Sequence, residues 1–193
     1  MLNEFIQSVQ SVDESILLWI QANVQNDFLT PFIKAFTDLG NTGKIWILLG
    51  LLLLIPKATR RYGFYTLTAL FFSMVITNLT LKPMIDRPRP YVTIEELTPI
   101  VISGDPNSFP SGHTSAAFAA GITWLAMATS PWIKGIALLQ AILMGLSRLY
   151  VCVHYPSDVL VGALAGTLAA VLAVVLLRTL EQKFKTNHPQ TLQ

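Results

Sequence analysis

The stretch Asn107-Ser108-Phe109-Pro110-Ser111-Gly112-His113 ends a polar loop and opens directly into an apolar segment, residues 114–129. Apolar segments and polar loops alternate along most of the chain. Charged residues make up 12 % of the 193 residues and apolar residues 52 %, and the mean hydropathy is +0.54. Soluble proteins contain about 25 % charged residues. We therefore expect a single-domain, all-α, polytopic membrane protein.

The quoted stretch has the composition of a helix start that can bind an anion. Ser108 is expected to cap the helix, and Pro110 suits its first turn. The backbone N–H groups of Ser111, Gly112 and His113 would then point out of the helix N-terminus, where anions bind well. Gly112 lets a ligand approach the backbone closely, and Ser111 adds a hydroxyl donor. An ordinary helix cap with an interfacial histidine is the alternative.

About six transmembrane helices are expected from the apolar runs, and residues 62–81, with no charged side chain, are long enough to cross about 30 Å of hydrocarbon. Residues 1–26 have the pattern of an amphipathic helix at the membrane interface. Gly162 and Gly166 are spaced for close helix packing. We expect residues 1–180 to form the membrane domain and 181–193 a disordered polar tail. The expected spans are residues 16–24 together with 27–40 (an imperfect first span), 44–55, 62–81, 114–129, 135–153 and 159–177.

A second polar cluster, Lys82 to Pro90, follows one of these runs. Arg89 lies between two prolines, which stiffen the chain and fix where its guanidinium can point. A guanidinium binds phosphate through two hydrogen bonds, whereas Lys82 contributes a point charge. Arg87 can do either and is a possible headgroup contact. Snorkelling of Lys82 to the membrane surface is the simpler explanation for that residue.

The third cluster is Ser147-Arg148 followed by His154 and Asp158. Arg148 interrupts an apolar helix, which is costly in lipid unless the side chain faces a polar cavity. The Asp158 carboxylate can hold the Nδ1–H of His154 and leave Nε2 free as a nucleophile or base. A purely structural His–Asp hydrogen bond is the alternative. A metal site is not expected, because the histidines and acids lack the grouping of zinc or iron ligands.

The basic loops predict the orientation of the helices. If the spans alternate, one face of the membrane carries Lys57, Arg60, Arg61, Lys134, Arg178, Lys183 and Lys185, and the positive-inside rule makes that face cytoplasmic. The loops 82–113 and 148–158 then share the outer face. The cations in these two loops oppose the rule unless they serve to bind an anion.

The three clusters together resemble the type 2 phosphatidic acid phosphatase (PAP2) family. That family carries the motifs Lys-x6-Arg-Pro, Pro-Ser-Gly-His and Ser-Arg-x5-His-x3-Asp. All three occur here with every spacing met, and they read Lys82…Arg89-Pro90, Pro110-Ser111-Gly112-His113 and Ser147-Arg148…His154…Asp158. The motifs span residues 82–158, and the helical layout extends the resemblance over most of the chain.

The resemblance implies a two-step phosphatase that needs no metal or other cofactor. His154 would attack phosphorus and form a phosphohistidine, with Asp158 orienting it. His113 would protonate the leaving oxygen and then activate water. The phosphoryl oxygens would be held by Lys82, Arg89, Arg148, Ser111 and the Gly112 backbone. This agrees with the need of phosphoryl transfer for positioning and charge stabilisation.

The substrate expected for such a site is a membrane lipid phosphate, with the bilayer as the only other partner. Undecaprenyl diphosphate is the first choice, in a bacterial cytoplasmic membrane with the site facing outside. Phosphatidylglycerophosphate and phosphatidic acid are alternatives, as is a silent lipid-phosphate binder without turnover. Residues 91–109, with Glu95, Glu96 and Asp105, are expected to discriminate headgroups. A net charge of +2 does not favour nucleic acid, and the oligomeric state, monomer or homodimer, is open.

Overall fold

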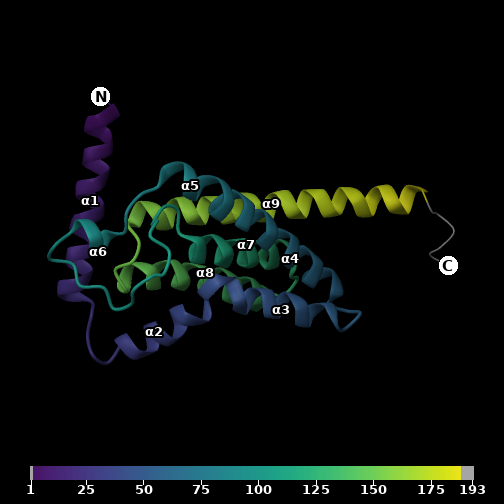
Figure 1. Cartoon of the computed structure of the whole chain (residues 1–193). Coiled ribbons are helices and arrows are strands. Elements are labelled where there is room, and N and C mark those ends of the chain that lie inside the picture. The colour runs from purple at the N-terminus through teal and green to yellow at the C-terminus, as the bar shows by residue number, and fades with distance from the viewer. Residues whose placement is uncertain (1, 188–193) are drawn as a thin grey trace.

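The computed structural model describes residues 2–187, and helices account for most of this range (Figure 1). Among these residues the only extended pairing is an isolated antiparallel bridge between Pro88 and Asn107. The all-α prediction is therefore confirmed. The elements are α1 (Leu2–Asn23), α2 (Thr30–Leu39), the 3-10 turn η1 (Asn41–Gly43), α3 (Lys44–Leu54), α4 (Arg60–Met74), the π-helical segment η2 (Val75–Leu81), α5 (Lys82–Ile85), α6 (Pro90–Thr93), α7 (Gly112–Met127), α8 (Pro131–Tyr150) and α9 (Pro156–Asn187).

Helix α7 lies at the centre of the bundle and packs against α4, α8 and α9. Its inner side chains are small, and Ala117, Ala119 and Ala120 are completely buried. Small residues let helix backbones approach closely, which is the main source of packing between helices in lipid. Gly166 of α9 lies so close to α7 that a Cβ atom there would collide with the Ser115 carbonyl oxygen. The glycine spacing noted in the sequence therefore brings α9 against α7.

Within residues 2–187, three helical segments are long and apolar enough to cross a membrane: Arg60–Ile85, Pro131–Tyr150 and Pro156–Phe184. Asn41–Leu54 forms a shorter apolar helix. The exposed surface of these helices is rich in leucine, isoleucine and valine, which is the surface that lipid covers. The chain is a membrane protein, and the count of about six spans stays a prediction.

The structure corrects two boundaries. Residues 16–40 do not form one imperfect span, because the chain turns at residues 24–29 and separates α1 from α2. At the other end, α9 continues through residues 181–187, where the polar composition had indicated a disordered tail. Continued i to i+4 hydrogen bonding carries a long helix past the end of its apolar stretch. Residues 188–193 of that tail lie outside the described part of the chain.

The bundle has two chemically different ends. Helix α1 crosses one end, beside the loops that join α5 to α7 and α8 to α9 (Figure 1). At the other end, the α3–α4 and α7–α8 turns meet the second half of α9: Tyr62 Oη donates to the Met127 carbonyl at 3.1 Å, and Arg61 pairs with Glu181. The polar clusters therefore share one end and the basic turns share the other, as alternating spans require.

The contact between α9 and α7 predicts an unequal response to two glycine substitutions. Gly166→Ala should lower the free energy of unfolding by about 1–3 kcal/mol, because the added methyl group would collide with backbone atoms of α7. Gly135→Ala on α8 is the control, since nothing lies within 4 Å of a Cβ there; it should be neutral or stabilising by up to about 1 kcal/mol. Thermal unfolding in detergent measures both. Equal melting temperatures for the two variants would contradict this packing.

Candidate active site

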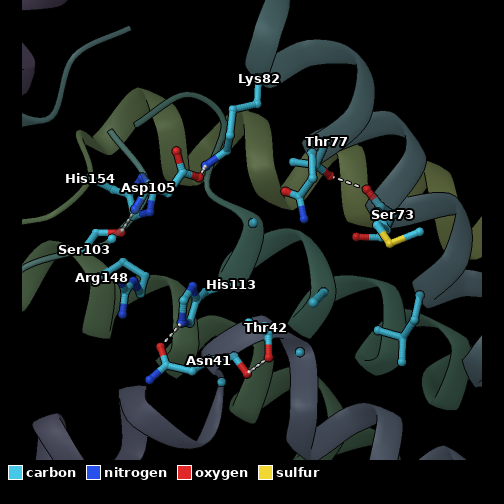
Figure 2. Close-up of a pocket in the computed structure, with 18 of the residues that line it drawn as sticks. Asn41, Thr42, Ser73, Thr77, Lys82, Ser103, Asp105, His113, Arg148 and His154 are labelled. Carbon is cyan, nitrogen blue, oxygen red and sulfur yellow. Dashed lines mark hydrogen bonds and ion pairs between the residues drawn. The ribbon is translucent and has the colours of Figure 1, made fainter. Parts of the chain in front are cut away.

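A cavity of about 990 Å³ lies at the end of the bundle crossed by α1, and residues of all three sequence clusters line it. Figure 2 shows Lys82, His113, Arg148 and His154 arranged around this space. These side chains come from the start of α5, the start of α7, the end of α8 and the α8–α9 loop. The structure thus brings together groups that are up to 72 positions apart in the chain (154 − 82). The charged and titratable lining residues are Asp38, Lys82, Arg89, Asp105, His113, Arg148 and His154.

The loops that carry the first two clusters are tied to each other. Ser108 is completely buried; its N–H donates to the Arg87 carbonyl at 2.7 Å and its Oγ to the Pro88 carbonyl at 2.9 Å. Pro88 also forms the bridge to Asn107. Because Pro88 and Pro90 fix the backbone on both sides of Arg89, these bonds decide where the guanidinium lies.

The predicted helix cap is off by three residues. Ser111, not Ser108, is the N-cap of α7, and its Oγ accepts a hydrogen bond from Thr114 Oγ1 at 2.9 Å. Its N–H donates to the Asp158 carbonyl at 3.0 Å and the residue is completely buried, while its hydroxyl accepts from Thr114 and keeps its own hydrogen to donate. Gly112 and His113 line the cavity, whereas Ser111 lies behind them. The predicted contact of the Ser111 hydroxyl with phosphate stays a prediction.

The hydrogen bonds around His154 define its tautomer. Arg89 Nη1 lies 3.1 Å from His154 Nε2, and a guanidinium can only donate. Nε2 therefore carries the lone pair and Nδ1 the proton. Nδ1 lies 3.6 Å from Asp158 Oδ2 and has no hydrogen-bond partner among the described residues. The ring has the predicted orientation, with its lone pair on the side of the cationic groups.

Burial lowers the pKa of His154 well below its ordinary value of 6.5, and the positive charges of Arg89, Arg148 and Lys82 lower it further. A depressed pKa means that the ring is neutral at physiological pH. A neutral imidazole with an available lone pair can act as a nucleophile.

Arg148 is 4 % exposed although it carries a full charge. Its Nη1 donates to Thr37 Oγ1 of α2 at 2.6 Å, while its Nε is buried and has no hydrogen-bond partner in the described part of the chain. An unpartnered buried donor is costly, so such atoms mark places where a ligand or water completes the bonding. The guanidinium lies in the wall of the cavity, which makes an anion the natural partner.

Lys82 follows the π-helical segment η2, a conformation that often occurs at functional sites. Its Nζ donates to Asp105 Oδ2 at 2.7 Å and to the Asn107 carbonyl at 3.1 Å. Asp105 also accepts a hydrogen bond from Arg89 Nε through its carbonyl at 2.9 Å. Of the loop predicted to discriminate headgroups, residues 101–105 line the cavity and Glu95 and Glu96 do not.

The second histidine, His113, faces η1 on the opposite wall of the cavity. Its Nε2 lies 2.9 Å from Asn41 Oδ1 (Figure 2). With the amide oxygen as acceptor, Nε2 carries the proton. The two histidines thus differ at Nε2, which carries a lone pair in His154 and a proton in His113.

Arg87 does not contact the cavity. Its guanidinium donates to Asp158 Oδ1 at 2.7 Å and to Asp13 Oδ2 at 2.8 Å. It also stacks on the ring of Tyr155, 3.7 Å from the ring centroid. This position gives no support to the predicted headgroup contact, because Arg87 lies behind the site, where its charge is matched by two carboxylates.

Four residues of the site were not found from the sequence. Asn41 and Thr37 precede the clusters by many positions and belong to a region that was expected to be a span and a turn. Asp13 and Gln10 of α1 carry polar groups on an otherwise amphipathic helix, where a solvent-facing position is the usual explanation. The local sequence does not single out Asp13, because Glu14 is a second carboxylate between the apolar Val12 and Ile16.

The environment of His154 predicts its titration. The midpoint for this ring should lie below pH 6.5, and Arg89→Gln should move it upward, because the variant removes one repelling positive charge while burial remains. NMR of protein labelled at histidine Cε1 measures the midpoint, with His154→Gln used for assignment. Lys57→Gln, an exposed lysine at the opposite end, should leave the midpoint unchanged. A midpoint at or above 6.5 would contradict the arrangement of charges.

Several known proteins are similar to this chain. A model of the PAP2 superfamily matches residues 62–182. An undecaprenyl-diphosphatase of Sulfolobus acidocaldarius is 35 % identical over 123 residues, which cover 62 % of this chain and 57 %, little more than half, of that relative. A lipid A 4'-phosphatase of Bacteroides thetaiotaomicron is 24 % identical, over 95 % of this chain and 85 % of the relative.

Among solved structures, a transmembrane PAP2 type phosphatidylglycerolphosphate phosphatase from Bacillus subtilis is similar, with a TM-score of 0.74 and 26 % sequence identity. The match covers 89 % of this chain and 87 % of that one. The region matched by the family model contains all three motifs, at residues 82–158. The resemblance drawn from the motifs is thereby confirmed, and the chain belongs to the PAP2 superfamily.

Proposed function

We propose that the protein is a phosphatase that removes the terminal phosphate from a membrane lipid, with undecaprenyl diphosphate as its substrate. The observation that carries the proposal is the lone pair of His154 Nε2, which lies in one cavity with Lys82, Arg89 and Arg148. Three cations can hold the oxygens of a phosphoryl group while a neutral imidazole attacks phosphorus.

In the first step, Nε2 of His154 forms a bond to phosphorus and the bond from phosphorus to the leaving oxygen breaks. Arg89 donates to Nε2 in the free protein, so it must transfer this hydrogen bond to a phosphoryl oxygen before attack. The unpartnered Nε of Arg148 and the N–H of Gly112 supply further donors. The leaving oxygen takes the Nε2 proton of His113, replacing Asn41 as its acceptor; for this His113 must be an imidazolium, whose charge the anionic substrate favours, and the transfer leaves it a neutral imidazole.

In the second step, water attacks the phosphorus of the phosphohistidine. His113, now without its proton, accepts one from that water, and the bond between phosphorus and Nε2 breaks. The products are inorganic phosphate and the lipid with one phosphate fewer, and both histidines return to their starting protonation states. Asp158 stabilises the positive charge that His154 carries while it is phosphorylated.

The shape of the cavity favours a lipid over a soluble phosphate ester. Besides the charged end, its wall includes apolar side chains of α3 and α4, among them Ile47, Phe71 and Met74. These three are 41 %, 56 % and 43 % exposed, so the apolar wall reaches the surface that lipid covers. A lipid can therefore keep its chain in the bilayer while its phosphate reaches His154.

Undecaprenyl diphosphate is favoured among lipid phosphates by the 35 % identity to an undecaprenyl-diphosphatase. Phosphatidylglycerophosphate is the second candidate, supported by the extensive structural similarity to a phosphatidylglycerolphosphate phosphatase. The basic turns at the end of the bundle away from the cavity support a site on the outer face of a bacterial cytoplasmic membrane.

Phosphate release by detergent-purified protein in the presence of EDTA tests the proposal. Undecaprenyl diphosphate, phosphatidylglycerophosphate and phosphatidic acid are compared side by side, and undecaprenyl diphosphate should have the highest kcat/KM. His154→Ala should lower kcat by about 10³-fold or more, because it removes the nucleophile. A higher kcat/KM for another lipid would move the assignment to it. Binding of all three lipids without turnover would show a silent lipid-phosphate binder.

The contact between Asn41 and His113 predicts a role for Asn41 in placing the proton. Asn41→Ala should lower kcat about 10-fold with little change in KM, since the imidazole loses the group that fixes its tautomer. Asn41→Gln, which keeps the amide, should restore part of the loss. Asn23→Ala serves as a control, because it removes the same side chain from an exposed position at the end of α1. Wild-type kcat in Asn41→Ala would exclude this role.

A further inference from the structure

We propose that helix α1 positions the active site from the side of His154 that faces away from the cavity. Asp13 positions Arg87, and Arg87 fixes the carboxylate of Asp158 beside His154. The inference rests on the proposed function, because it concerns the same nucleophile. Neither Asp13 nor Arg87 lines the cavity, so both are positioning residues. The three groups form a continuous chain of hydrogen bonds from α1 to α9.

Arg87 bridges the two carboxylates with separate nitrogen atoms. Nη1 donates to Asp158 Oδ1 at 2.7 Å, and Nη2 donates to Asp13 Oδ2 at 2.8 Å. Ser157 Oγ and Gln10 Oε1 accept further bonds from the same two nitrogens. Stacking on Tyr155 fixes the plane of the guanidinium. A lysine could not reproduce this geometry, because its charge is a single point.

Asp13 is buried although it belongs to a helix with a largely exposed surface. Its side chain is 4 % exposed, and Asp13 Oδ1 accepts a hydrogen bond from the N–H of Ser157 at 2.9 Å. Ser157 lies in the first turn of α9, next to Asp158. Asp13 therefore contacts both Arg87, which binds Asp158, and Ser157, which precedes Asp158 in the chain.

The position of α1 against the rest of the protein is itself fixed. Leu17, one turn after Asp13, is completely buried and packs with Cys152 and Tyr155. Gln21, one turn further, donates to the Glu96 carbonyl at 2.9 Å and accepts from the Thr98 N–H at 2.7 Å. These contacts lie on one face of α1, so this face delivers Asp13 to Arg87 in a defined position.

The carboxylate of Asp158 has little freedom to rotate. Oδ1 is held by Arg87, and Oδ2 accepts the N–H of Tyr155 at 2.9 Å. The distance of 3.6 Å from Oδ2 to His154 Nδ1 is therefore set by the two donors that hold the carboxylate. Loss of Arg87 would free Oδ1 and allow the carboxylate to turn away from the imidazole.

The balance of charge explains why Asp13 is needed as well. An arginine bound to Asp158 alone would draw the negative charge of that carboxylate toward itself. Asp13 shares the positive charge of Arg87, so Asp158 retains more of its negative charge for the imidazolium that forms during catalysis. Asp13→Asn removes this sharing with almost no change in side-chain volume.

The experiment measures kcat and KM for undecaprenyl diphosphate, together with inhibition by inorganic phosphate. Asp13→Asn should lower kcat about 10-fold and Arg87→Gln about 100-fold, within the range found for groups that orient a catalytic side chain from behind. KM and the inhibition constant of phosphate should change less than about twofold, because Lys82, Arg89 and Arg148 are untouched. Arg87→Lys should have a kcat between those of the wild type and Arg87→Gln, and it gives an independent test if Asp13→Asn does not fold.

Asp27→Asn is the matched control, since it removes the same charge from an exposed position in the turn after α1 and should leave kcat unchanged. In the double variant Asp13→Asn/Arg87→Gln, kcat should equal that of Arg87→Gln alone, because Asp13 acts through Arg87. Wild-type kcat in Asp13→Asn, or independent losses in the double variant, would overturn the positioning role. Turnover by His154→Ala would instead overturn the proposed function, so the two failures are distinguishable.

Discussion

The structure depends on the burial of positive charge at one end of an apolar bundle. Arg89 and Arg148 are 3 % and 4 % exposed, in a chain of which only 12 % of the residues are charged. Isolated buried charges are very costly, and this cost falls only when hydrogen bonds and counter-charges surround them. Backbone carbonyls, Thr37 and Asp105 supply part of that compensation. One donor, the Nε of Arg148, is left without a partner among the described residues. An anion in the cavity would complete the arrangement, and phosphate has the geometry to do so.

The charged side chains around His154 form two separate groups, one on each side of the imidazole. In front of the imidazole lie the cations that face the cavity. Behind it, Arg87 is enclosed by Asp13 and Asp158, so its positive charge is matched and adds little to the field in the cavity. Two arginines only two positions apart, Arg87 and Arg89, thus have opposite tasks. The intervening Pro88 turns them in different directions, because it fixes the backbone while its carbonyl is held by Ser108.

The sequence was sufficient for the fold class and for the lysine, arginine and histidine side chains of the cavity wall. Apolar runs separated by polar loops predicted helices, and the motif spacing predicted that Lys82, Arg89, His113, Arg148 and His154 would meet. It was insufficient where a residue is positioned by a tertiary contact. Ser111 became the cap because its N–H is held by the Asp158 carbonyl, a bond between segments 47 positions apart (158 − 111). Arg87 turned away from the cavity because α1 offers a carboxylate that no local pattern reveals.

The free protein orients both histidines for the first chemical step, in which His113 must carry a proton on each ring nitrogen. Arg89 occupies the lone pair of His154, and Asn41 occupies the proton of His113. Each of these bonds can be exchanged for a bond to substrate: Arg89 would move to a phosphoryl oxygen, and the leaving oxygen would replace Asn41. Substrate binding would then uncover the nucleophile and the acid together, while the side chains behind His154 remain in place. A site of this kind keeps its reactive groups satisfied while it is empty, which limits the cost of holding them away from water.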